Sequence, residues 1–152
     1  MIYTNLACAN NYVKATARMQ PASVFANLET THRMSLIYKI FRSDEYDAFR
    51  AKGATNGAPV DLQDGFIHFS TAAQLAETAR RHFAGEDGLW VVAVQTQALG
   101  AALKWEPSRG GDLFPHLYRE LRSEDVEFQR EVIGADGFLE AIGAVGTGKG
   151  QT

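Results

Sequence analysis

The sequence predicts an α+β domain with a split, mostly antiparallel sheet and two main helices. The first observation behind this prediction is the order of the patterns. Helical periodicity occurs early in the chain, whereas short apolar runs typical of strands crowd the later part. The second observation is the composition. The 152 residues are 45% apolar and 22% charged, which suffices for one domain with a hydrophobic core.

Three segments are expected along the chain. In residues 1–33, apolar side chains follow neither the 3.6-residue period of a helix nor the 2-residue period of a strand for long. A clear pattern begins only after Met34. We therefore expect Met34 to be the natural start and residues 1–33 to be a disordered upstream extension. A weak organellar-type targeting segment is the less favoured alternative, because this stretch is poor in acids. Residues 34–142 then form a single α+β domain, and the Gly-rich residues 143–152 form a flexible tail.

The first part of the domain alternates strands and helices. Residues 36–41 are rich in β-formers and predict a strand. Ser43 is the expected N-cap of a helix that continues to about Lys52, with acidic residues in its first turn, where the helix dipole favours them. Residues 53–59 are expected to form a loop. Residues 72–83 repeat apolar side chains at spacings of three and four, which predicts an amphipathic helix.

A short strand is expected between these two helices. Residues 66–69 are mainly apolar β-formers that follow the turn signal Asp64-Gly65. The chain then enters the second helix through a capping box, in which Thr71 is the N-cap and Gln74 stands three residues later.

Strands dominate the second half of the domain. Residues 89–94 are apolar on both faces and predict a central strand. The remaining expectations are strands at 103–106, 113–121 and 126–132, a turn at 97–100, a flexible loop at 108–112, and a last short piece at 137–139.

Charge and cysteine content exclude several classes of function. The net charge is −3, and residues 1–33 hold three basic residues and one acidic residue, so the remaining body is more acidic still. General nucleic-acid binding is therefore not expected, because it needs a basic face. Cys8 is the only cysteine, which excludes an internal disulfide and a cysteine zinc site. The chain has no apolar run of membrane-spanning length, so we expect a cytoplasmic protein without a membrane partner.

Two histidines stand out as candidate catalytic residues. His68 lies near the end of its predicted strand, where the chain leaves the sheet. His116 lies on a later predicted strand, and Tyr118 follows it at i+2, so both should point to the same face. Histidine is the usual general acid or base near neutral pH. Glu106 closes another strand, just before a Gly-rich loop, and could orient a histidine or a ribose hydroxyl.

A metal site is a second interpretation of the histidines. His68, His82 and His116 with Glu106 contain zinc-ligand types. No pair has the i, i+4 spacing of a zinc-binding helix, and His82 lies on a different element from His68. No metal is therefore expected.

Four pieces of the chain resemble the domain of unknown function 952 family of uncharacterised bacterial proteins. They are residues 37–40, 64–71, 103–106 and 114–118, and the Gly-Phe-Ile-His and Phe-Pro-His-x-Tyr motifs are the most specific. The structural relatives of this family belong to the ADP-ribosyltransferase-like fold. The resemblance therefore implies a split, curved antiparallel sheet with a nicotinamide-nucleotide-type cleft.

The order of elements is similar to the transferase core of poly-ADP-ribose polymerases, in which a Gly-x-Tyr-Phe strand leads into a helix. This similarity places His68 near the position of the nicotinamide-stacking tyrosine. Those enzymes carry His or Arg on the opening strand, where this chain has Tyr38 or Lys39. Glu106 and Glu120 are both candidates for the transferase glutamate.

These observations predict a cleft that binds a small nucleotide or related phosphate ligand. NAD or an ADP-ribose-like molecule is the implied cofactor, and the chemistry is that of an ADP-ribosyl or phosphoryl transferase. The expected catalytic residues are His68, His116 and Glu106, and the expected ligand-binding residues are Tyr38, Asp64, Ser70, Trp105 and Tyr118. Two alternatives stay open: a non-catalytic binding module, and a purely structural domain whose histidines stabilise the fold.

Overall fold

The computed structural model describes residues 35–133 and 137–143. The expectations for residues 1–33 and for most of the tail lie outside the described residues. The strands are β1 (Leu36–Arg42), β2 (Ala54–Thr55), β3 (Ile67–His68), β4 (Leu89–Gln95), β5 (Leu103–Pro107), β6 (Leu113–Leu117), β7 (Leu121–Arg122) and β8 (Val126–Val132). The α-helices are α2 (Ser43–Lys52), α3 (Pro59–Asp64), α4 (Ala72–His82), α5 (Thr96–Leu99) and α6 (Gly137–Gly143). Three 3₁₀ turns lie at Gly100–Ala102, Arg109–Gly111 and Ser123–Asp125.

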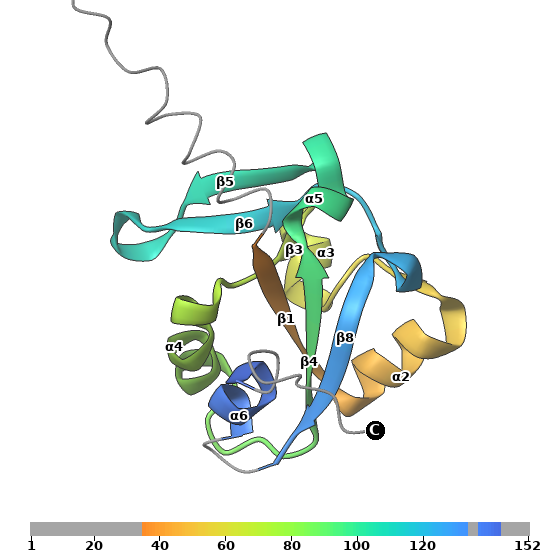
Figure 1. Ribbon diagram of the computed structural model, residues 1–152, viewed down its shortest axis with the longest axis vertical. Coiled ribbons are helices and arrows are strands. Elements are labelled where there is room, and N and C mark those ends of the chain that lie inside the picture. The colour runs from red at the N-terminus through yellow and green to blue at the C-terminus, as the bar shows by residue number, and fades with distance from the viewer. Residues whose placement is uncertain (1–34, 134–136, 144–152) are drawn as a thin grey trace, which may run out of the picture.

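The strands form two separate three-stranded antiparallel sheets, which agrees with the predicted α+β class and its antiparallel pairing. One sheet has the order β1-β4-β8 and the other has the order β3-β6-β5, while β2 and β7 form a small third pair. In Figure 1, α4 and α6 lie together on one side of β1, and α2 lies on the other side of the sheet. Strands β5 and β6 run across the end of the β1-β4-β8 sheet.

Strand β4 is the centre of the hydrophobic core. Its residues Val91–Val94 are fully buried, as expected of a strand that is apolar on both faces. Val92 and Val94 pack in one cluster with side chains from β1, α2, β3 and β6. Val91 and Ala93 pack in a second cluster with side chains from α4 and α6. Burial on both faces therefore holds the two sheets and the helices together.

Helix α4 begins as its sequence predicts. The Thr71 hydroxyl accepts a hydrogen bond from the Gln74 backbone amide at 3.3 Å, and the Gln74 side-chain oxygen accepts one from the Thr71 amide at 3.0 Å. The predicted capping box is therefore confirmed. It fixes the point at which the chain leaves β3 and turns away from the sheet.

Several sequence-based element boundaries are wrong. The N-cap of α2 is Arg42 rather than Ser43, because the Arg42 amide donates to Glu45 Oε2 and the Ser43 hydroxyl instead donates to the Gly88 carbonyl oxygen. Residues 113–121 do not form one strand but divide into β6 and β7, which pair with different partners. Residues 97–99 are helical in α5, and residues 137–139 belong to helix α6, whose Phe138 packs on the second core cluster.

The most consequential error concerns residues 59–64. The sequence predicts a loop that ends at Pro59 and a turn signal that begins at Asp64, with no helix between them, but these residues form the short helix α3. Pro59 suits the first helical position, because its fixed φ matches the helix and the missing N–H has no helical partner there. Gly65 then ends the helix in the left-handed conformation, with φ 82°. This helix places Asp61 against His68, one of the two predicted catalytic histidines.

Candidate functional site

The β3-β6-β5 sheet gathers polar side chains on one face. His68 on β3 and Lys104 on β5 are both direct register partners of His116 on β6, so the three side chains project from the same face. Their neighbours Ile67 and Leu117 alternate to the other face and belong to the first core cluster. The pleat of the sheet thus separates a polar face from the core.

The two histidine rings lie beside each other on that face. The centroids of the His68 and His116 rings are 5.2 Å apart, and the rings meet edge to face at 72°. The Phe66 ring stacks on His116 at 4.3 Å and lies 4.6 Å from His68. Phe66 therefore restricts the orientation of both imidazoles from one side.

A buried carboxylate holds His68. Asp61 is only 1% exposed, and its Oδ1 lies 2.7 Å from His68 Nδ1 and 3.0 Å from the His68 backbone amide. Its Oδ2 accepts hydrogen bonds from the Ala58 amide at 2.7 Å and from the Lys39 ammonium at 2.5 Å. Because an ionised carboxylate only accepts, the Nδ1 of His68 is the donor in this pair.

A second carboxylate holds His116. Glu106 Oε2 lies 2.8 Å from His116 Nδ1 and accepts the hydroxyl hydrogen of Tyr118, also at 2.8 Å. The Lys104 ammonium lies 4.2 Å from the centroid of the Tyr118 ring. Glu106 is more exposed than Asp61, so the two histidines have carboxylate partners in different surroundings.

These contacts shift the pKa values of the acidic groups. Burial alone would raise the pKa of Asp61, but hydrogen bonds from His68 and the charge of Lys39 outweigh it, and the pKa lies below its ordinary value. Hydrogen bonds from His116 and Tyr118 lower the pKa of Glu106. The same bond to Glu106 raises the pKa of Tyr118, because only the protonated phenol can donate it. Both histidine partners are thus ionised at neutral pH.

The two rings differ in their surroundings. His68 Nε2 lies 3.3 Å from Asp64 Oδ2. For His116 the structure gives a hydrogen bond at Nδ1, to Glu106, and the side chain is only 8% exposed. An imidazole whose Nδ1 is bonded to a carboxylate can take or give a proton at Nε2.

A family model described as "Protein of unknown function (DUF952)" matches residues 40–128. The chain belongs to this family. The matched range contains both histidines and both of their carboxylate partners, whereas Lys39 lies one residue before it. No curated protein matches the chain.

Solved structures also match the chain. The crystal structure of protein CC0527 from Caulobacter crescentus is 48% identical, with a TM-score of 0.64 over 68% of this chain and 91% of that protein. The solution NMR structure of the same protein is 48% identical, with a TM-score of 0.61 over 68% of this chain and 90% of that one. The similarity therefore covers most of the described residues.

In the structure of the present chain, five of the residues predicted for the site lie together. His68, His116, Glu106 and Tyr118 are joined by hydrogen bonds or ring contacts, and Asp64 lies beside His68. Glu120, the other candidate for the transferase glutamate, instead lies 3.4 Å from Arg122 Nε.

Three other predicted residues do not join this cluster. The Tyr38 side chain is buried in the second core cluster, 6.5 Å from the Phe128 ring centroid. The Ser70 hydroxyl is buried and lies 3.0 Å from the Thr78 hydroxyl. Trp105 packs against the first core cluster, on the opposite face of β5 from its neighbour Glu106.

The structure adds residues that sequence reasoning missed. Asp61 is the most important, followed by Lys104 and Phe66. Lys39, one of the two residues at the opening-strand position, joins the site through Asp61. One signal was present in the sequence: Lys39 is the only charged residue within the apolar run 36–41. A charge in a buried strand requires a buried partner, and that requirement points to a carboxylate such as Asp61.

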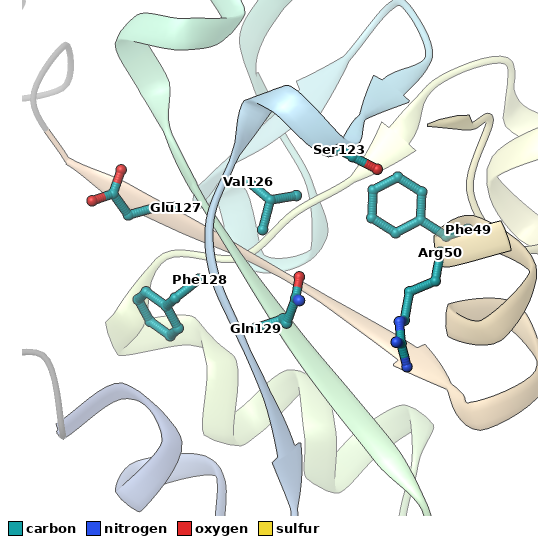
Figure 2. Close-up of a pocket in the computed structure, with 7 residues that line it drawn as sticks. All are labelled: Phe49, Arg50, Ser123, Val126, Glu127, Phe128 and Gln129. Atoms are coloured by element: carbon teal, nitrogen blue, oxygen red, sulfur yellow. The ribbon is translucent and has the colours of Figure 1, made fainter. Parts of the chain in front are cut away.

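Two cavities lie away from the histidines. The first, of about 490 Å³, lies between α2 and β8, with Arg50 at one side and Val126 and Gln129 along the strand. Figure 2 shows that its polar groups come from separate elements and do not converge on a single point. The second, of about 400 Å³, lies beside α2 and α3 and includes Leu62. Neither is lined by His68 or His116.

Two further properties concern the described residues alone. Within residues 35–133 and 137–143, no three His, Cys, Asp or Glu side chains are grouped so that they could hold a metal ion. None of the helices in these ranges is both long and apolar enough to cross a bilayer.

Proposed function

We propose that the β3-β6-β5 face binds a phosphate-bearing ligand of the nucleotide class and uses His68 and His116 as proton-transfer groups. The observation that carries this proposal is the pair of carboxylate-bound imidazoles whose ring centroids lie 5.2 Å apart. Paired histidines with carboxylate partners suit acid–base chemistry, because a carboxylate bonded to Nδ1 orients each ring.

The charges around the pair favour an anionic ligand when the imidazoles are protonated. Lys39 and Asp61 form a buried ion pair and balance each other. The remaining acids are Asp64 and Glu106, and they face the two imidazoles and the Lys104 ammonium. With both rings protonated the positive charges exceed the negative charges by one, so a phosphate group is attracted. With one ring neutral, the state that group transfer uses, the charges balance.

The same pair can support group transfer. In phosphoryl transfer, one neutral imidazole accepts the proton of an attacking hydroxyl at Nε2 while the new O–P bond forms. The other ring, as imidazolium, gives its proton to the leaving oxygen as the old O–P bond breaks, so protons balance. In ADP-ribosyl transfer from an NAD-type donor, the acceptor oxygen bonds to the ribose C1′ while the C1′–N bond to nicotinamide breaks. Only a base is needed, because it takes the acceptor proton and nicotinamide leaves as a neutral ring with the electron pair of the broken bond.

An ADP-ribosyltransferase-like fold is part of this proposal. Its support is the order of elements, in which strand β3 leads into helix α4 and a later strand carries His116. Lys39 stands at one of the two positions considered for the opening-strand motif, and it connects to His68 through Asp61. Glu106, one of the two candidates for the transferase glutamate, binds His116 beside His68. These contacts support the proposal.

Ligand-induced thermal shifts test the proposal. The full chain is heated with orthophosphate, mononucleotides, ADP-ribose and NAD, because a ligand that binds the native state raises the Tm. His68→Gln and His116→Gln should abolish the shift. His82→Gln is the matched control at the end of α4 and should retain it. The proposal fails if no probe shifts the wild-type protein at millimolar concentration, or if the shift survives both site substitutions.

One observation favours a non-catalytic role as the second candidate. The His116 side chain is only 8% exposed, and its ring packs against Phe66, as a purely structural histidine would. In that case His116→Ala should lower the stability by several kcal/mol, the scale of a broken buried network, without any ligand effect to lose. A bound ligand without turnover would instead indicate a binding module.

A further inference from the structure

We infer that Asp61 is the positioning residue of the site: it holds the neutral His68 ring as the Nδ1–H tautomer and directs Nε2 outward. This inference rests on the proposed function only for its consequence, which is that His68 presents a proton-accepting Nε2 to a ligand. The tautomer itself is a property of the free protein and can be measured without any ligand.

The first support is the complete use of the Asp61 carboxylate. Oδ1 faces two donors of His68, the backbone amide at 3.0 Å and Nδ1 at 2.7 Å. Oδ2 faces the Ala58 amide and the Lys39 ammonium. A carboxylate has about four acceptor positions, and all four are occupied here. The group therefore cannot rotate away from Nδ1 without leaving a buried donor unpaired.

The second support is that the backbone is built closely around this carboxylate. Gly57 has φ 94°, and a Cβ at that position would lie 2.2 Å from Asp61 Oδ2. The Gly57 conformation and the absent side chain together leave the space that Asp61 fills. Pro59 and Gly65 bound the short helix that carries Asp61, so its position is fixed from both ends.

The third support is the contrast with Asp64, the other acid beside His68. The Asp64 side chain is 41% exposed, and it lies 3.3 Å from Nε2 rather than Nδ1. Since a neutral Nδ1–H ring carries a lone pair at Nε2, Asp64 gains a hydrogen bond only when that nitrogen is protonated. Asp61 therefore sets the orientation of the ring, whereas Asp64 contacts only its charged form.

The decisive measurement is the imidazole tautomer by ¹⁵N NMR on the full chain at alkaline pH, where the rings are neutral. The wild-type His68 signals should report a proton on Nδ1. Asp64→Asn should leave that tautomer unchanged. Asp61→Asn should shift it toward Nε2–H, because an amide has only one accepting oxygen and must turn its NH₂ to one side. Wild-type His68 found as the Nε2–H tautomer would overturn the inference, as would a shift in Asp64→Asn but not in Asp61→Asn.

A second variant covers the case in which Asp61→Asn does not fold, because it leaves the Lys39 ammonium buried without its partner. The double variant Lys39→Met/Asp61→Ala removes both that charge and the acceptor that faces Nδ1, so it should show the tautomer shift toward Nε2–H. An unchanged Nδ1–H tautomer would contradict the inference. Orthophosphate titration of the wild type reports separately on the proposed function. A correct tautomer without phosphate binding would reject the function and keep Asp61 as the positioning residue.

Discussion

His68 and His116 are direct partners across β3 and β6, and this register brings their ring centroids to 5.2 Å. Side chains opposite each other in an antiparallel pair project from the same face at short Cβ separation, so the contact follows from the backbone pairing. The carboxylates that bind the two histidines come from elements other than β3 and β6. Asp61 reaches His68 from α3, and Glu106 reaches His116 from β5.

Replacing Gly57 tests how closely the backbone fits Asp61. Gly57→Ala should destabilise the protein by roughly 3 kcal/mol or more, because the new Cβ would clash with the buried carboxylate in addition to the strain of a positive φ. Gly85→Ala is the matched control, since Gly85 also has a positive φ, 77°, but a Cβ there meets nothing within 4 Å. It should cost only about 1 to 2 kcal/mol. Urea unfolding measures both values, and equal losses would contradict the prediction.

The buried ion pair should be sensitive to the loss of one partner. Lys39→Ala removes the cation that faces Asp61 in the core, and breaking such a pair typically costs about 3 to 5 kcal/mol. Glu77→Ala is the surface comparison, because Glu77 pairs with Arg80 and Arg81 on exposed α4 and should change stability little. Denaturant midpoints at constant m-value report both effects. Comparable stability for Lys39→Ala and the wild type would show that the pair contributes nothing.

Strand alternation explains how much of the site was predictable. His116 and Tyr118 are two residues apart, so their shared face follows from the period of a strand, and they lie together as expected. The same alternation explains why Trp105 is not in the cluster. It is adjacent to Glu106, so only one of the two can face the histidines, and Trp105 packs toward the core.

Asp61 could not be predicted for a different reason. Its role depends on helix α3, which has only six residues and too short a periodic pattern to identify. Lys39 in an apolar strand indicates that some buried carboxylate is needed, but the order of residues does not show which one, and Asp61 lies 22 positions later. The helix α6 could not be predicted for a similar reason. Its burial depends on contact with β8 and α4 rather than on its own sequence pattern.

Acid should weaken the fold partly through Asp61. Its pKa is below the ordinary value: burial opposes this, but the bonds from His68 and the charge of Lys39 prevail. A carboxyl with a lowered native pKa stabilises the fold above its unfolded pKa of about 3.9, and that contribution disappears as pH falls through the native pKa. Stability should therefore decline below about pH 5 and fall steeply below about pH 4.

Urea unfolding between pH 6 and pH 3 provides the measurement of this acid effect. Asp61→Asn, or Lys39→Met/Asp61→Asn if the single variant does not fold, should show a shallower decline than the wild type. Glu127→Gln on the exposed part of β8 should follow the wild-type slope. If all these slopes coincide, Asp61 does not contribute to acid unfolding.

Lys104 provides a test of charge on the proposed ligand face. Its ammonium lies over the Tyr118 ring and projects from the same face as His116, so a bound phosphate group would lie within reach of its charge. Lys104→Ala should weaken orthophosphate or nucleotide binding about fivefold at low salt, the effect of roughly 1 kcal/mol expected for a partly exposed charge. Isothermal titration calorimetry gives the affinity, and the loss should shrink as salt screens the interaction. Arg130→Ala, which removes a cation stacked on Phe128 in a different sheet, is the control for net charge alone. Equal weakening by the two substitutions would indicate nonspecific attraction and would exclude Lys104 from the site.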